Sequence, residues 1–277
     1  MTYQQEYKAS IEQPEAFWKK QSQRIQWFKE PGKILAKDEN GIDRWFVDGE
    51  LNTAYLALDY HVLNGRGDQL ALIYDSPVTG SKRTYTYSQL TEAVALTAGM
   101  LKDQGVEKGD RVIVYMPMIP EAAIAMLACA RLGAVHSVVF GGFAPHELAI
   151  RIDDAEPKVI MSASCGIEIE RVIEYKPILD EAIKLAKHKV GRCLIYQRET
   201  KTCELTAGRD LDWEKTIATT QPADCTPVNA LDPLYVLYTS GTTGKPKGVV
   251  RDNGGHAVAM SYSMDVVYDM QPGDVFW

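Results

Sequence analysis

Apolar runs of strand length alternate with helix-length segments along most of this chain, and that alternation limits the folds open to it. Strands are predicted at 71–74, 111–117, 136–140, 158–161 and 192–196, with a hairpin partner for the first at 82–87. Helices are predicted between them, one capped by Ser88 and closed by Gly105, and others at Glu121–Gly133, Pro145–Ala155 and Asp180–Lys189. Repeated strand–helix–strand units imply a parallel-rich sheet flanked by helices, so the predicted fold class is α/β. Sheets of this kind bind ligands outside the carboxyl ends of their strands.

A glycine-rich loop that also carries lysines follows the apolar run Leu234–Leu237. Residues 238–248 read YTSGTTGKPKG. The glycines let the backbone approach a ligand closely, and Lys245 and Lys247 supply two positive charges. Exposed N–H groups and lysine charges both favour oxyanions, so the loop suits a polyphosphate. The candidate phosphate-binding residues are Thr239, Ser240, Gly241, Thr242, Thr243, Gly244, Lys245, Lys247 and Gly248.

Two known motifs do not fit this loop. A Walker A loop has four residues between its glycines and Ser or Thr after the Lys, whereas two residues separate Gly241 from Gly244 and Pro246 follows Lys245. A nucleophile elbow requires Gly two positions before its serine, where Tyr238 stands. By residue type alone, a solvated surface loop stays open as an alternative.

Composition excludes several classes of protein. With 277 residues, 45% of them apolar and 24% charged, the chain is typical of a soluble globular protein with a sizeable core. A net charge of −7 argues against nucleic-acid binding, so a local cluster such as Lys245, Lys247 and Arg251 must hold any anionic ligand. The first residues lack the apolar core of a signal peptide, and no stretch approaches the roughly 18 apolar residues of a membrane span.

The cysteines and histidines indicate a reducing compartment and no protein metal site. The five cysteines are widely spaced without a CxxC pair, which predicts free thiols in a cytoplasmic protein. Cys165 could be a nucleophile, but no base lies near it in the sequence, so a packing role is favoured. The five histidines form no H-x-x-x-H pair.

The two ends of the chain lie outside the regular alternation. Pro14 opens a predicted helix, and a second helical stretch is predicted at Gly49–Tyr60. The large aromatic residues of 1–62 predict that this segment packs onto the rest of the protein; they are Trp18, Trp27, Phe28, Trp45 and Phe46. Residues 272–277 predict a turn and the start of an apolar strand, so we expect the chain to be the front portion of a longer protein.

Several long strings give the chain a family resemblance. The loop 238–248 resembles the phosphate-binding signature of the AMP-forming acyl-CoA synthetases, members of the adenylate-forming superfamily. Residues 43–52 and 115–143 resemble the acetyl- and propionyl-CoA synthetases of that group, and 164–177 and 250–258 look more like the propionyl enzymes. The resemblance implies the front part of the large N-terminal domain of such an enzyme, truncated. It implies an N-terminal segment at 1–62 and the first part of the AMP-binding domain at 63–277.

The resemblance also implies a reaction and a set of partners. In this family a carboxylate attacks the α-phosphate of ATP in the presence of Mg²⁺, and the thiol of coenzyme A then displaces AMP. The loop residues would hold the triphosphate, where negative charge must be neutralised. Coenzyme A would lie near Phe140, Gly141, Gly142 and Arg171. Glu168 stands where the family has a second arginine, and an ordinary exposed side chain is the alternative for Arg171.

Propionate is the predicted carboxylate, with acetate as the alternative. The acyl pocket and the catalytic residues are expected beyond Trp277, so residues 1–277 alone are expected to be inactive. An enzyme that passes its acyl group to a carrier protein is a second hypothesis. A nucleotide-binding fragment without catalysis is a hypothesis from another class.

Overall fold

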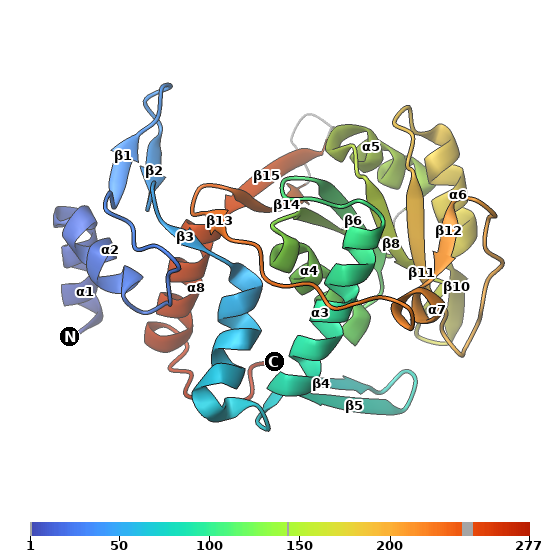
Figure 1. Ribbon diagram of the computed structural model, residues 1–277, viewed down its shortest axis with the longest axis horizontal. Coiled ribbons are helices and arrows are strands. Elements are labelled where there is room, and N and C mark those ends of the chain that lie inside the picture. Colours follow the sequence, from blue (N-terminus) through green and yellow to red (C-terminus); the bar gives the residue numbers. More distant parts are fainter. Residues whose placement is uncertain (1, 143, 240–245) are drawn as a thin grey trace.

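The computed structural model describes residues 2–142, 144–239 and 246–277 (Figure 1). Its helices are α1 (Tyr3–Glu12), α2 (Pro14–Ser22), α3 (Tyr87–Asp103), α4 (Pro120–Leu132), α5 (Pro145–Ala155), α6 (Tyr175–Leu185), α7 (Trp213–Ile217) and α8 (Asn253–Val266), with π-helical turns at Tyr55–Asp59 and Val62–Arg66. Its strands are β1 (Leu35–Lys37), β2 (Asp43–Trp45), β3 (Glu50–Leu51), β4 (Leu70–Ser76), β5 (Ser81–Thr86), β6 (Arg111–Met116), β7 (Val135–Phe140), β8 (Val159–Ala163), β9 (Cys165–Glu168), β10 (Arg171–Glu174), β11 (Arg192–Tyr196), β12 (Asp210–Asp212), β13 (Val228–Asn229), β14 (Pro233–Thr239) and β15 (Lys247–Asp252).

A seven-stranded sheet forms the centre of the molecule, in the order β12-β11-β8-β6-β7-β14-β15. Its neighbouring strands are parallel except for β14 and β15, which pair antiparallel. The predicted α/β class is therefore confirmed. The antiparallel edge strand β15 was not predicted, because the glycines and lysines around it read as loop.

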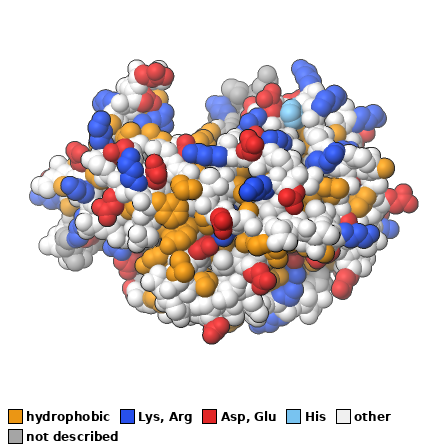
Figure 2. Space-filling view, viewed as in Figure 1, with side chains coloured by type: hydrophobic (Ala, Val, Ile, Leu, Met, Phe, Trp, Pro, Cys, Tyr) orange, Lys and Arg blue, Asp and Glu red, His pale blue; other side chains and the backbone are white. Residues whose placement is uncertain are grey.

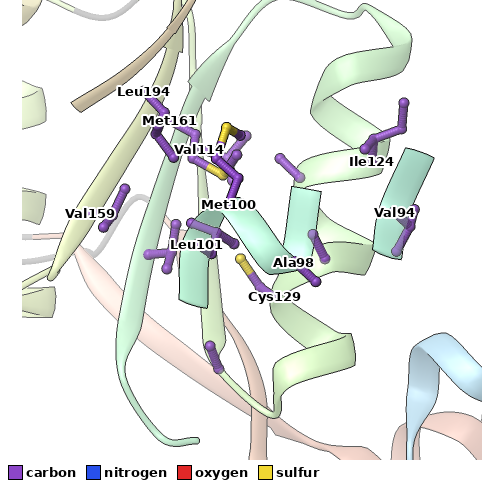
Figure 3. Packing of buried hydrophobic residues seen from close by; sticks show 14 of the residues in the cluster. Val94, Ala98, Met100, Leu101, Val114, Ile124, Cys129, Val159, Met161 and Leu194 are labelled. Carbon is purple, nitrogen blue, oxygen red and sulfur yellow. The ribbon is translucent and has the colours of Figure 1, made fainter. Parts of the chain in front are cut away.

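Helices cover both faces of the sheet, as the alternation predicts. Val112 and Val114 of β6 pack with α3 and α4 on one face, while Ile113 and Tyr115 pack with α5 and α6 on the other. All four side chains are fully buried. Figure 3 shows the first of these layers, with side chains of α3 and α4 directed toward those of β6, β8 and β11.

The start of α3 differs from the prediction. Thr86, not Ser88, is the N-cap: its hydroxyl accepts from the Gln89 amide, and the Gln89 side chain accepts from the Thr86 amide. This reciprocal pair satisfies two amides that the helix itself leaves unpaired. The predicted C-terminal end is confirmed, because Gly105 follows the helix with a φ of +78°.

The predicted helix Asp180–Lys189 is shifted in the structure, where α6 runs from Tyr175 to Leu185. Its buried face is set by Tyr175, Leu179 and Ala182, spaced by one helical turn each. The chain leaves the helix after Leu185 because the amides of Lys187 and His188 donate to the carboxylate of Asp153 on α5.

The N-terminal segment packs against the last part of the chain, as its aromatic content predicts. Leu51 of β3 pairs with Val228 of β13, and a core cluster joins Trp27 and Phe46 to Val258 of α8. The predicted helical stretch at Gly49–Tyr60 instead begins as β3 and becomes helical from residue 53. The predicted strand at the other end is wrong: residues 274–277 have no regular secondary structure.

One buried amide connects the N-terminal segment to the sheet layer. Asn52 is fully buried, and its Nδ2 donates to the carbonyls of Ala130 at 2.9 Å, Arg131 at 3.1 Å and Thr226 at 2.8 Å. Its Oδ1 accepts from the amide of Tyr55 at 3.0 Å. The carbonyls come from two segments far from Asn52 in the sequence, the end of α4 and residue 226, so the side chain fixes how these segments meet its own.

We expect Asn52→Asp to destabilise the folded protein by about 3–5 kcal/mol at neutral pH, because the oxygen that replaces Nδ2 would carry negative charge and face three buried carbonyl oxygens. Urea unfolding of the full-length protein measures the change. Asn64→Asp is the matched control, since the exposed Asn64 donates to the Tyr60 carbonyl only. Equal losses in the two variants would contradict the role given to Asn52.

Candidate functional site

The strands that precede the two predicted ligand loops are neighbours in the sheet. β7 ends at Phe140 and β14 ends at Thr239, and the two strands run parallel with His136 opposite Tyr235. The turn at Gly141 and Gly142 and the start of the glycine-rich loop therefore leave the same edge of the sheet. This is the carboxyl edge, where such sheets bind ligands.

The structure describes part of the predicted phosphate loop. Ser240, Gly241, Thr242, Thr243, Gly244 and Lys245 lie outside the described residues. Thr239 and Lys247 are exposed and pair opposite each other, at the last position of β14 and the first of β15. Lys247 and Gly248 are thus strand residues, which corrects their assignment to the loop. The pairing places one hydroxyl and one ammonium group at the sheet's edge.

Tyr238 precedes this pair and has contacts on several sides. Its hydroxyl donates to Asp154 Oδ2 at 2.6 Å, and the guanidinium carbon of Arg151 lies 5.6 Å from its ring centroid. Burial and the Asp154 carboxylate both raise the pKa of Tyr238, so the hydroxyl stays protonated as a donor. Across the ladder stands Gly248, where a Cβ would come within 3.3 Å of the ring and 2.9 Å of Val236. These contacts are not predicted from the sequence, where Tyr238 is the first residue of the glycine-rich loop and its partners lie far away along the chain.

In the Phe140–Gly142 turn, the middle residue is buried and the other two are exposed. Gly141 is buried, and a Cβ there would come within 2.1 Å of the Tyr175 hydroxyl. The side chain of Phe140 is 69% exposed, and Gly142 is exposed beside it. Gly141 is therefore a glycine because Tyr175 fills the space of a side chain. Phe140 and Gly142 remain accessible to a ligand.

Arg171 lies on a hairpin that the sequence did not predict. It is exposed and opens β10, directly opposite Glu168 of β9. In the same hairpin, a Cβ at Gly166 would come within 2.4 Å of the Tyr175 hydroxyl that also approaches Gly141. Tyr175 thus joins the hairpin to the turn, because its ring lies against both Gly141 and Gly166.

Other candidate groups have packing roles or no role in a site. Cys165 is fully buried in β9, as expected for a packing residue. Among the described residues, no three His, Cys, Asp or Glu side chains could hold a metal ion together. None of the described helices is both long and apolar enough to cross a membrane. On the face drawn in Figure 2, basic and acidic side chains are interspersed, without a continuous basic patch.

Two protein-family models match this chain. Residues 60–277 match the AMP-binding enzyme family, and residues 3–57 match the acetyl-coenzyme A synthetase N-terminus. The chain belongs to the AMP-binding enzyme family. The resemblance to acyl-CoA synthetases noted from the motifs is confirmed.

Several curated proteins match over nearly the whole chain. It is 50% identical over 276 residues to the human protein titled acyl-CoA synthetase short-chain family member 3, mitochondrial, covering 99% of this chain and 40% of that one. It is 44% identical over 279 residues to acetyl-coenzyme A synthetase of Desulfatibacillum aliphaticivorans, covering 99% and 43%. An uncharacterized protein of Pseudomonas aeruginosa is 58% identical over 277 residues, covering 100% and 44%. The chain therefore spans less than half the length of these relatives.

A solved structure matches the fold. Acetoacetyl-CoA synthetase from Streptomyces lividans superposes with a TM-score of 0.87 at 28% identity, covering 96% of this chain and 41% of that one. The fold described above is thus the fold of the corresponding part of an adenylate-forming enzyme.

One buried histidine, His136, lies near the start of β7. His136 is 8% exposed, its ring lies 5.6 Å from that of Tyr235, and no described group hydrogen-bonds its Nδ1. Burial, with a smaller contribution from His256, lowers the pKa of His136 from 6.5 to about 4. The folded protein therefore holds this ring neutral where the unfolded chain would protonate it.

We expect stability to fall as the pH drops from about 6.5 to about 4, because in that window the unfolded chain binds a proton at His136 that the folded protein does not. The contribution of this ring is up to about 3 kcal/mol. Urea unfolding across the window measures it in the full-length protein. His136→Asn should flatten the slope, while His146→Asn, at an exposed position, should not. Identical slopes in all three proteins would contradict the assignment.

Proposed function

We propose that the protein is a short-chain acyl-CoA synthetase, which joins a small carboxylate to coenzyme A and converts ATP to AMP and pyrophosphate. The observation that carries the proposal is the parallel pairing of β7 and β14, which directs Phe140 and Thr239, the last residues of these strands, to the same edge of the sheet. Membership of the AMP-binding family and the acyl-CoA synthetase titles of several relatives support it.

The reaction has two steps with different demands. A carboxylate oxygen first bonds to the α-phosphorus of ATP, and the bond to the pyrophosphate oxygen breaks. The thiolate of coenzyme A then attacks the acyl carbon, and AMP leaves. Mg²⁺ arrives bound to the ATP phosphates, as part of the substrate. The first step must stabilise the leaving pyrophosphate, and the Thr239 hydroxyl and Lys247 ammonium stand at the edge where it would lie.

Coenzyme A fits the second group of residues. The exposed ring of Phe140 and the bare backbone of Gly142 offer an apolar and a polar contact, and Arg171 offers a positive charge for a phosphate. Glu168, directly opposite Arg171, reduces the local positive charge. Gly141 supports the turn through its packing against Tyr175.

We also propose propionate as the carboxylate, with acetate as the alternative. The support is the likeness of residues 250–258 to propionyl-CoA synthetases. In the structure, this string is fixed by packing: Asn253 accepts from the Thr53 hydroxyl at 2.7 Å, and a Cβ at Gly254 would come within 2.5 Å of Ala230. These residues define a local packing arrangement, so substrate choice needs a direct measurement.

The remaining proposals concern organisation and location. We propose that 1–62 is an N-terminal segment and 63–277 the first part of the AMP-binding domain, although the two share a core around Trp27 and Val258. All five cysteines are free, which supports a cytoplasmic location. The inactivity of residues 1–277 alone stays a prediction.

We expect the full-length protein to use propionate with a higher kcat/KM than acetate. Steady-state rates of AMP release with each acid, at saturating ATP and coenzyme A, measure the ratio. A preference for acetate would contradict the propionate assignment and leave the synthetase proposal standing. Failure with every short carboxylate, together with retained ATP binding, would favour the non-catalytic alternative. Transfer to a carrier protein but not to coenzyme A would favour the other enzyme hypothesis.

We expect Lys247→Ala to slow formation of the acyl-adenylate by about 10²–10³, the usual cost of losing one positioned charge donor. Thioester formation from pre-made acyl-adenylate should change little, because pyrophosphate has left before the thiol attacks. ATP–pyrophosphate exchange and single-turnover thioester formation measure the two steps. The control is Lys189→Ala, because it removes an exposed lysine that is not among the predicted ligand-binding residues. Equal losses in both steps would indicate a general structural role for Lys247.

A further inference from the structure

We propose that Tyr238 is a positioning residue, which holds the outer ends of β14 and β15 against helix α5 and so places Thr239 and Lys247 for the triphosphate. The inference rests on the proposed function and concerns the same site. It assigns a role to Tyr238, which is not among the predicted phosphate-binding residues, and to its partner, Asp154.

The sheet itself holds this end of β14 weakly. Among the described residues, the ladder between β7 and β14 consists of the single pair His136 and Tyr235. Beyond that pair, β14 is bonded to β15 alone, and β15 is the last strand of the sheet. Consistent with this separation, Val138 of β7 is 37% exposed and Leu237 of β14 is 50% exposed. The two outer strands therefore need a second anchor if their ends are to stay in place.

Tyr238 supplies that anchor through three contacts. Its hydroxyl donates to Asp154 at 2.6 Å, the Arg151 guanidinium lies over its ring, and its ring edge faces Gly248 across the ladder. A side chain at position 248 would press on the ring, so the glycine makes room for it. The tyrosine thus bridges β14, β15 and α5.

Helix α5 is a firm support for this bridge. Leu148 and Ile152 of α5 are fully buried in the core cluster on that face of the sheet. Arg151 is 6% exposed and pairs with Glu147 at 2.9 Å, one helical turn earlier. The helix begins at Pro145, three residues after Gly142. Helix α5 thus begins close in sequence to the turn proposed for coenzyme A and carries the Tyr238 contact in its last turn.

The contact can be tested in the full-length protein with Tyr238→Phe, Asp154→Ala and Asp154→Asn. We expect Tyr238→Phe and Asp154→Ala to slow ATP–pyrophosphate exchange about tenfold, which corresponds to losing about 1.4 kcal/mol of a charged hydrogen bond. Thioester formation from pre-made acyl-adenylate should stay within about twofold. Asp154→Asn keeps an acceptor oxygen and should recover part of the loss. Combining Tyr238→Phe with Asp154→Ala should cost no more than either change alone.

The matched control is Asp153→Ala, the same substitution one residue earlier in α5. Asp153 accepts from the amides of Lys187 and His188 and has no bond to Tyr238. Asp153→Ala should lower the thermal stability without changing the ratio between the rates of the two half-reactions. If the rates of both half-reactions fall equally in Tyr238→Phe, the positioning role is wrong and Tyr238 has a general structural role instead.

Hydrogen–deuterium exchange separates this inference from the proposed function. We expect the amides of β15 to exchange about tenfold faster in Tyr238→Phe, with those of β6 unchanged. Unchanged exchange in β15 would overturn the anchoring contact, whatever the enzyme does. A wild-type protein without pyrophosphate exchange would instead refute the proposed function, and the exchange data would still decide whether Tyr238 holds the strands.

Discussion

Burial of the central strands on both faces is the constraint on which the rest of the structure depends. Val112 and Val114 of β6 face one layer of helices and Ile113 and Tyr115 face the other, all fully buried. A strand buried on both faces needs helices on both sides, and parallel neighbours need crossover connections that supply them. The carboxyl ends of the strands then gather at one edge. That geometry directs the turn after β7 and the end of β14 to the same edge of the sheet, although almost 100 residues of chain separate them.

The sequence predicts the parts of this fold that local chemistry determines. Helix α5 has the predicted bounds, Pro145–Ala155, because a proline suits its first turn and an apolar stripe continues to its end. The cap of α3 was misplaced by two residues, since Thr86 and Ser88 are equally good caps by type and only the partner Gln89 decides between them. Helix α6 begins at Tyr175, earlier than predicted, and the amides that follow its C-terminal end bond to Asp153, a residue of another helix that the local sequence does not reveal. The hairpin of β9 and β10 was missed because its residues mix charged and apolar side chains without a clear turn signal.

The candidate site shows why motif glycines are difficult to interpret from sequence. A glycine in a ligand loop is usually explained by backbone freedom or close approach of the ligand. In this protein Gly141 and Gly166 make room for the ring of Tyr175, and Gly248 makes room for the rings and methyl groups of β14. These are packing requirements set by residues elsewhere in the chain. Packing alone can therefore require a glycine that a sequence pattern explains by a ligand.

Helix α5 connects the two halves of the proposed chemistry. Its first turn follows Gly142, and its last turn carries Asp154, which binds Tyr238 beside the Thr239–Lys247 pair. A displacement of the outer strands of the sheet would therefore act on the same helix as a displacement of the Phe140–Gly142 turn. Because Leu148 and Ile152 fix that helix in a fully buried layer, the contact between Asp154 and Tyr238 has a firm support. An enzyme that must present one intermediate to two successive partners gains from such an arrangement, since the acyl group cannot be moved far between the two steps without losing its alignment.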